Sequence, residues 1–119
     1  MTFIKINNTL YIATISGRVA DNAWDNRESK SITLEMDYAI AIKLFVNGLA
    51  WSIVQKEEVP VYDENDEQTG TEIKETEFDN SDYNLAGDIT DHRDGTITVK
   101  MGKLTDLEEA YEIMFGGNN

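Results

Sequence analysis

Hydrophobic and polar residues alternate over long stretches of this chain, a pattern typical of β-strands that bury one face. The alternation is clearest in residues 84–101, where two such runs flank a short polar turn. After the turn, residues 97–101 place an apolar side chain at every second position. Asp94 and Gly95 form a pair that tolerates positive φ, as a tight hairpin turn requires. The pattern predicts a β-hairpin, and we expect the other elements to be arranged around it.

Further strands are predicted before this hairpin, because the same alternation recurs in four β-rich runs. They span residues 3–6, 10–16, 31–36 and 49–55. Asn7 and Asn8 separate the first two runs and favour a tight turn between them. Residues 18–30 show no clear period, and within them we expect an ordered loop at residues 21–27 that Trp24 anchors to the core.

Two stretches show helical periodicity instead of alternation. The first spans residues 37–47, with Asp37 as the N-cap and Gly48 placed for a left-handed C-cap. Its predicted inward face consists of Tyr38, Ile42 and Phe45, with Ala41 and Leu44 beside them. The second helix spans residues 105–115, where Thr105 and Glu108 form a capping box. Its predicted inward stripe consists of Leu107, Tyr111 and Met114.

These elements predict an α+β fold in a single domain, residues 1–119. It should be a mostly antiparallel β-sheet of about six to seven strands, rich in hairpins, with two short helices packed on it. A chain of 119 residues with 40% hydrophobic content is large enough for one core. The chain has no cysteine, so neither disulfides nor thiolate metal sites can stabilise it.

Acidic residues are concentrated in the middle of the chain, whose formal net charge is −13. From residue 57 to residue 94, only Lys74 and Arg93 oppose a long series of carboxylates. So much negative charge repels nucleic acids and anionic membranes. We therefore expect no direct nucleic-acid partner and no membrane partner.

Within this acidic region, residues 56–80 predict a projecting β-ribbon. Pro60 fits an edge strand, since it cannot donate a hydrogen bond into a central ladder. We expect a strand at 59–62, a loop at 63–70 and a polar strand at 71–78. The candidate partner-binding residues are the carboxylates of this region and two apolar anchors: Glu57, Glu58, Tyr62, Asp63, Glu64, Asp66, Glu67, Glu72, Glu75, Glu77, Phe78, Asp79 and Asp82.

The candidate catalytic and metal-binding residues of this sequence are better explained by turns and loops. His92, the only histidine, has acidic neighbours and suggests a metal or acid–base cluster, but a solvated hairpin turn explains the same residues. The stretch 63–74 resembles a calcium loop, yet it has Gln68 where glycine belongs and Lys74 where a bidentate glutamate belongs. No nucleophile elbow or phosphate-binding glycine loop is present. We expect no catalytic, cofactor-binding or metal-binding residue, no enzymatic activity and no small-molecule ligand.

The two tryptophans allow one further interpretation. Trp24 and Trp51 could form a platform on which a sugar stacks. Trp51, however, lies in an apolar strand pattern, which favours a role in the core.

Several stretches of the chain resemble small proteins encoded in tailed-phage and prophage genomes. The resemblance lies in residues 10–19, 24–34 and 83–96, and in the closing Leu-Glu-Glu-Ala-Tyr-Glu segment. It implies an accessory protein of the tail module. These stretches are signatures of a fold and not catalytic motifs, so the resemblance assigns no functional residue.

Two functions are compatible with these features. The first is a structural or assembly component of a phage tail or virion, which binds neighbouring proteins through the ribbon. The alternative is an acidic DNA mimic that inhibits a host defence nuclease, as anti-CRISPR and anti-restriction proteins do. Its partner would be a basic nucleic-acid-binding host protein. In both cases we expect the protein in the bacterial cytoplasm during infection or in the virion. The polar start of the chain does not resemble a signal peptide.

Overall fold

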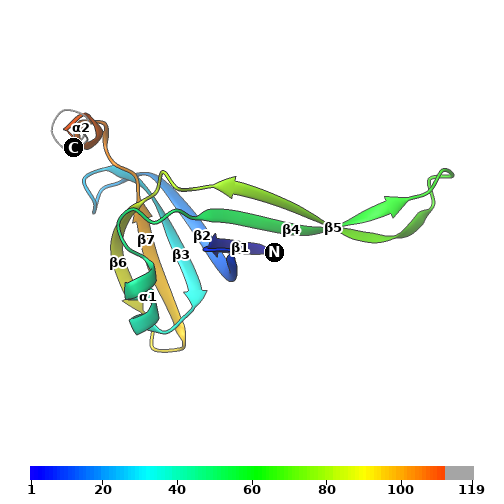
Figure 1. The fold of residues 1–119 in the computed structure, drawn as a ribbon, viewed down its shortest axis with the longest axis horizontal. Helices are drawn as coiled ribbons and strands as arrows, with labels where there is room; N and C mark the ends of the chain where they lie inside the picture. The colour runs from blue at the N-terminus through cyan, green and yellow to red at the C-terminus, as the bar shows by residue number, and fades with distance from the viewer. Residues whose placement is uncertain (112–119) are drawn as a thin grey trace.

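The structure is a computed structural model that describes residues 1–111. Its main element is one seven-stranded antiparallel β-sheet with the order β5-β4-β1-β2-β3-β7-β6 (Figure 1). The strands are β1 (Thr2–Ile6), β2 (Thr9–Asp21), β3 (Arg27–Glu35), β4 (Ser52–Tyr62), β5 (Gln68–Asp79), β6 (Leu85–Asp91) and β7 (Thr96–Gly102). The sheet-rich α+β class is confirmed.

Of the two predicted helices, only one packs on the sheet. Helix α1 (Tyr38–Leu44) lies against β6. The second helical segment, α2 (Asp106–Tyr111), is short and lies beyond the end of the sheet (Figure 1). The prediction of two packed helices is therefore wrong, because residues 103–105 carry the chain away from the sheet after β7 ends. Met114 and the rest of the predicted second helix are outside the described residues.

The core lies on the face of the sheet that α1 covers. Its buried side chains are Ile4, Ile6, Ala13, Ile32, Leu34, Ala41, Phe45, Trp51, Ile97, Val99 and Met101. Trp51 is 2% exposed, and its indole N–H donates to the Tyr83 carbonyl at 2.9 Å. Burying this large ring requires a partner for its one polar atom, and the backbone supplies it. The interpretation of Trp51 as a core residue is confirmed.

The predicted inward face of α1 is correct only in part. Ala41 and Phe45 are buried, but Tyr38 and Ile42 are exposed. Ile42 is one residue past Ala41, which turns its side chain about 100° away from the sheet. Tyr38 begins the helix, and Asp37 provides no side-chain cap there. A helix of seven residues makes about two turns, so only a few of its side chains can lie against the sheet.

The hairpin of β6 and β7 lies at one edge of the sheet and not at its centre. Its turn also differs from the expected one, because the positive φ values belong to Arg93 and Gly95. Asp94 instead accepts hydrogen bonds from the backbone N–H and the hydroxyl of Thr96. These two bonds lower the pKa of Asp94.

The ordered loop predicted at residues 21–27 is confirmed, but the aperiodic residues on either side of it belong to strands. β2 continues to Asp21 and β3 starts at Arg27, which leaves five residues for the turn. Alternation disappears from the sequence here because the strands bury polar side chains, as described below. Trp24 extends from the turn and packs against Gly87 and Gly102, so its predicted anchoring role is confirmed.

This close packing of Trp24 gives a testable prediction. A Cβ atom at Gly102 would lie 2.7 Å from the Trp24 ring and 2.8 Å from Arg27 Cδ. Gly102→Ala should therefore lower the free energy of unfolding by about 1–3 kcal/mol, measured by urea denaturation. Gly17→Ala is the control, since its nearest neighbour would be 4.0 Å away. Equal stabilities of the two variants would contradict the observed packing.

The molecule is strongly elongated, measuring 62 × 37 × 28 Å. Its radius of gyration is 18.1 Å, whereas a compact chain of this length would have about 13–14 Å. The extra length comes from β4 and β5, which extend well past the rest of the sheet (Figure 1).

Candidate protein-binding ribbon

Beyond its base, where β4 pairs with β1, the β4–β5 hairpin forms a two-stranded ribbon that no other element of residues 1–111 covers. Pairing is regular from Ser52 opposite Asp79 to Val61 opposite Gly70. The adjacent strand β1 ends where Thr2 pairs with Gln55, so in the described part of the chain the β4 residues beyond Lys56 pair only with β5. Every residue of β5 is exposed.

The ribbon has two faces, since residues opposite each other in an antiparallel pair share a face. One face lies on the same side of the sheet as the core, because Ile53, which is opposite Phe78, packs against the core. We call it the core-side face. Beyond Ile53 and Phe78 it carries Glu57, Val59, Val61, Glu72 and Lys74. The outer face carries Lys56, Glu58, Pro60, Thr71, Ile73, Glu75, Glu77 and Asp79.

The structure distributes the predicted partner-binding residues over several surfaces. Glu57, Glu72 and Phe78 lie on the core-side face, and Glu58, Glu75, Glu77 and Asp79 lie on the outer face. Asp63, Glu64, Asp66 and Glu67 form the tip, next to Tyr62. Asp82 lies outside the ribbon and lines a hollow near β3. The carboxylates therefore do not form one continuous surface.

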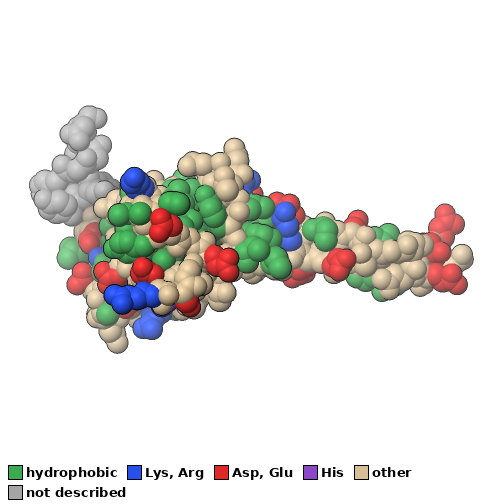
Figure 2. Space-filling model, turned by 90° about the horizontal axis from the view of Figure 1, so that it is seen from below, with side chains coloured by type: hydrophobic (Ala, Val, Ile, Leu, Met, Phe, Trp, Pro, Cys, Tyr) green, Lys and Arg blue, Asp and Glu red, His purple; other side chains and the backbone are tan. Residues whose placement is uncertain are grey.

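Charge on the ribbon is most concentrated at the tip, where Figure 2 shows acidic side chains at the end of the arm. Asp63 Oδ1 accepts from the backbone N–H groups of Asn65 and Glu67, at 2.8 and 3.0 Å, and so orders the turn. Within residues 1–111, no ion pair involves Glu64 or Asp66. These carboxylates face solvent and attract basic groups.

At the base of the ribbon, by contrast, the carboxylates are already engaged. Lys5 Nζ lies 3.2 Å from Glu77 Oε1, and this contact lowers the pKa of Glu77. The hydroxyl and backbone N–H of Ser81 lower the pKa of Asp79. The carboxylates available to a partner are therefore those between the base of the ribbon and its tip.

Three large apolar side chains of the ribbon are exposed to solvent. Tyr62 is 58% exposed, Ile73 63% and Phe78 48%. Sequence reasoning selected Tyr62 and Phe78 as anchors but left out Ile73. The signal for Ile73 was present, because it is the one apolar side chain among the polar residues of 71–77. Exposed apolar groups bordered by charges are typical of protein-binding surfaces.

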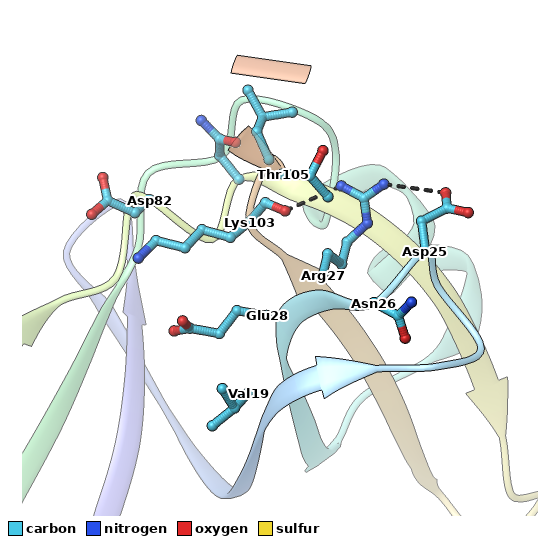
Figure 3. Close-up of a pocket in the computed structure, with 10 residues that line it drawn as sticks. Val19, Asp25, Asn26, Arg27, Glu28, Asp82, Lys103 and Thr105 are labelled. Carbon is cyan, nitrogen blue, oxygen red and sulfur yellow. Dashed lines mark hydrogen bonds and ion pairs between the residues drawn. The ribbon is translucent and has the colours of Figure 1, made fainter. Parts of the chain in front are cut away.

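A second candidate site is an open hollow of about 750 Å³ between the start of β3 and residues 103–105 (Figure 3). Arg27, which is 4% exposed, lies in its wall. Its guanidinium donates to Glu108 at 2.6 and 3.0 Å and to the Lys103 carbonyl at 3.1 Å. The guanidinium carbon also lies 5.0 Å from the centre of the Trp24 ring. These contacts hold α2 at the end of the sheet, and we interpret the hollow as structural.

A buried polar cluster lies next to Arg27. Asp21 is fully buried and accepts from Lys100 Nζ at 2.6 Å, from Ser29 Oγ at 3.2 Å and from the Ala23 N–H at 3.1 Å. The Lys100 contact is the main cause of the lowered pKa of Asp21. Sequence reasoning missed this cluster entirely, because charged residues separated by most of the chain give no local pattern.

Glu108 gives a pH-dependent prediction. Arg27, with help from the Thr105 N–H, lowers the pKa of Glu108 from 4.5 to about 2. A lowered pKa means that Glu108 stabilises the attachment of α2 above pH 4.5 and loses this effect as the pH falls toward 2. Backbone amide chemical shifts of α2 should therefore move toward coil values over this range in the wild type.

The matched variant is Glu108→Gln, which should show the coil-like shifts already at pH 7 and no further change in this range. Glu35→Gln, an exposed substitution on β3, serves as the control and should titrate like the wild type. Wild-type shifts that stay constant from pH 5 to pH 2 would rule out this attachment.

The structure groups no metal-binding set within residues 1–111. No three acidic or histidine side chains there are placed to share a metal ion. His92 lies in the exposed turn between β6 and β7 and contacts Thr98 Oγ1 at 2.7 Å. Neither helix of the described chain has the length and apolar character needed to cross a membrane.

Comparison with known proteins gives no family for this chain: no protein-family model, curated protein or solved structure matches it. The functional interpretation therefore depends on the residues and geometry of the chain itself.

Proposed function

We propose that this chain is a non-enzymatic binding protein that attaches to another protein through the β4–β5 ribbon. The observation that carries the proposal is the uncovered ribbon itself. A two-stranded ribbon alone in water is marginally stable, and it usually gains a third strand or a packing partner. Within residues 1–111 nothing covers β5, every residue of which is exposed, so we assign this cover to another protein.

The proposed setting is a phage or prophage particle, as a component of the tail or virion or of its assembly. Its support is the resemblance of the sequence to tail-module accessory proteins. Projecting ribbons suit such assemblies because they reach a neighbouring subunit and bury apolar anchors there. Tyr62, Ile73 and Phe78 are the anchors we assign to this contact.

The alternative function, a DNA mimic that inhibits a host defence nuclease, has one favourable observation. The tip carries four carboxylates and no basic residue between Asp63 and Glu67. The distribution of the other carboxylates favours the first function, because they divide between two faces. A mimic of a DNA backbone needs regularly spaced charges along one groove-facing surface.

A shortened ribbon tests the proposal. Glu57 and Lys74 are directly opposite each other, and their backbone groups face each other because those of the preceding pair, Lys56 and Glu75, point outward. An Asn-Gly turn can therefore replace residues 58–73 between them. The wild-type and shortened proteins would each be used to capture partners from cells that produce the chain naturally, with identification by mass spectrometry. We expect virion proteins with the wild type and their loss with the shortened form.

Salt dependence separates the two functions. Binding through apolar anchors, backbone hydrogen bonds and a few ion pairs should weaken by less than about ten-fold when NaCl rises from 50 to 200 mM, whereas a DNA mimic in a basic groove should weaken by about 10³-fold or more. Capture of the same proteins by both forms would refute the proposed role of the ribbon.

A further inference from the structure

The two long edges of the ribbon differ in their capacity to pair with another strand. On the β4 edge, Lys56 exchanges both backbone hydrogen bonds with Met1, at 2.7 and 2.9 Å. The backbone polar groups of Lys56 therefore point away from β5, and by alternation those of Glu58 and Pro60 do so too. Pro60 has no N–H, so the β4 edge lacks a donor in the middle of its free portion.

The β5 edge has no such interruption. Because Lys56 is opposite Glu75, the backbone groups of Glu75 also point away from the other strand. The same alternation directs outward the backbone groups of Thr71, Ile73, Glu77 and Asp79. None of these residues is proline, and within residues 1–111 none donates or accepts a further backbone hydrogen bond. This edge presents a continuous row of donors and acceptors.

The side chains along β5 decide which strand could use this row. Glu72, Glu75 and Glu77 flank the single cation Lys74. A second copy of β5 would place like charges side by side, which disfavours self-association. A segment rich in Lys and Arg would meet opposite charges instead, and an apolar residue in it would cover Ile73, which is 63% exposed.

We propose that the free edge of β5 is a strand-addition site, and that its occupant is an extended, basic segment of the protein partner, which pairs as an eighth strand. This inference specifies how the ribbon of the proposed function binds, and it rests on that function. Backbone hydrogen bonds to the outward groups from Thr71 to Asp79 would supply much of the affinity, and the glutamates would select for Lys and Arg.

Synthetic peptides and edge-blocked variants test the proposal. The probe is a 12-residue peptide that alternates Lys with Thr and Val, and its counterpart carries Glu in place of Lys. We expect the wild type to bind the Lys peptide and not the Glu peptide. Binding should slow amide exchange at Ile73, Glu75 and Glu77, which point outward, more than at Glu72 and Lys74, which face β4.

The decisive variant is Ile73→Pro, which removes one outward N–H in the way that Pro60 does on the other strand. Its affinity for the Lys peptide should fall about ten-fold or more. Ile73→Val keeps the N–H and should bind within about two-fold of the wild type. Thr71→Pro, opposite Pro60, removes an outward N–H at a second position of the same edge. Reduced binding by both proline variants would not be explained by a folding defect at one position.

Equal binding by the wild type and both proline variants would overturn the proposal, since attraction between charges would then suffice. So would slowed exchange confined to the inward amides, or no binding of the Lys peptide. Failure of this strand-addition proposal is distinguishable from failure of the proposed function. If the shortened ribbon loses the natural partner while Ile73→Pro retains it, the ribbon is the docking arm but its β5 edge is not the contact.

Discussion

Trp51→Ala is expected to lower the free energy of unfolding by about 3–5 kcal/mol, because it leaves a large cavity in the core. Trp51 is 2% exposed and packs within the cluster that joins the sheet to α1. Its indole N–H also holds the segment after β5 in place through the Tyr83 carbonyl. The substitution therefore removes apolar contact and a hydrogen bond together.

Urea denaturation monitored by circular dichroism measures this loss. Trp51→Phe is the informative comparison, since it keeps most of the apolar volume but cannot donate to Tyr83. We expect its stability to lie between those of the wild type and Trp51→Ala. Tyr62→Ala, a truncation on the exposed ribbon, should change stability by less than about 0.5 kcal/mol. A similar loss for Tyr62→Ala and Trp51→Ala would mean that Trp51 is not the core residue we describe.

The strand pattern of this fold was predictable because one face of each strand is buried. Alternation identified β1, β7 and the hairpin turn at Asn7 and Asn8, where both residues have positive φ. It could not fix the order of strands, which depends on contacts between distant segments. For this reason the β6–β7 hairpin, although locally the clearest, was wrongly expected at the centre.

The sequence did not predict the end of β2 and the start of β3, where polar side chains are buried in place of apolar ones. Asp21, Ser29 and Arg27 are buried in β2 and β3, and they gave these strands the composition of a loop. Their partners, Lys100 and Glu108, lie at least 79 residues further along the chain than Asp21 and Arg27, respectively. Such pairs cannot be inferred from local periodicity, since only the fold brings them together.

The candidate ribbon was predictable in composition but not in geometry. Its charge and Pro60 indicated an exposed edge strand from the sequence. The register was needed to show that Pro60 interrupts one edge while the β5 edge is continuous. It also showed that Glu57 and Glu58, adjacent in sequence, face opposite sides. The binding mode thus depends on the pairing of strands more than on the number of carboxylates.

Removing the partner of the buried carboxylate should produce the second large effect. Lys100→Met is expected to lower the thermal midpoint by about 10 °C or more at pH 7, because it leaves Asp21 charged and buried without a cation. Lys100 is the main cause of the lowered pKa of Asp21, and the carboxylate has no exposed surface through which water could replace it. Differential scanning calorimetry measures the change.

The pH dependence of this loss identifies its cause. In the wild type, the lowered pKa of Asp21 contributes stability that is fully present above the ordinary value of 3.8 and is lost as the pH falls below it toward the lowered pKa. In Lys100→Met, burial without a cation raises the pKa of Asp21, so the carboxyl group becomes neutral at a higher pH. The difference in thermal midpoint between the two proteins should therefore be greatest near pH 7 and decrease below about pH 4.

A double variant completes the test. Asp21→Asn combined with Lys100→Met removes both charges and keeps a side chain that can hydrogen-bond to Ser29. The double variant should therefore reverse much of the decrease in thermal midpoint that Lys100→Met causes. If the double variant is as unstable as the sum of the single ones, the two residues are not coupled. In that case Lys100 would stabilise the sheet through its aliphatic chain on β7 and not through the buried carboxylate.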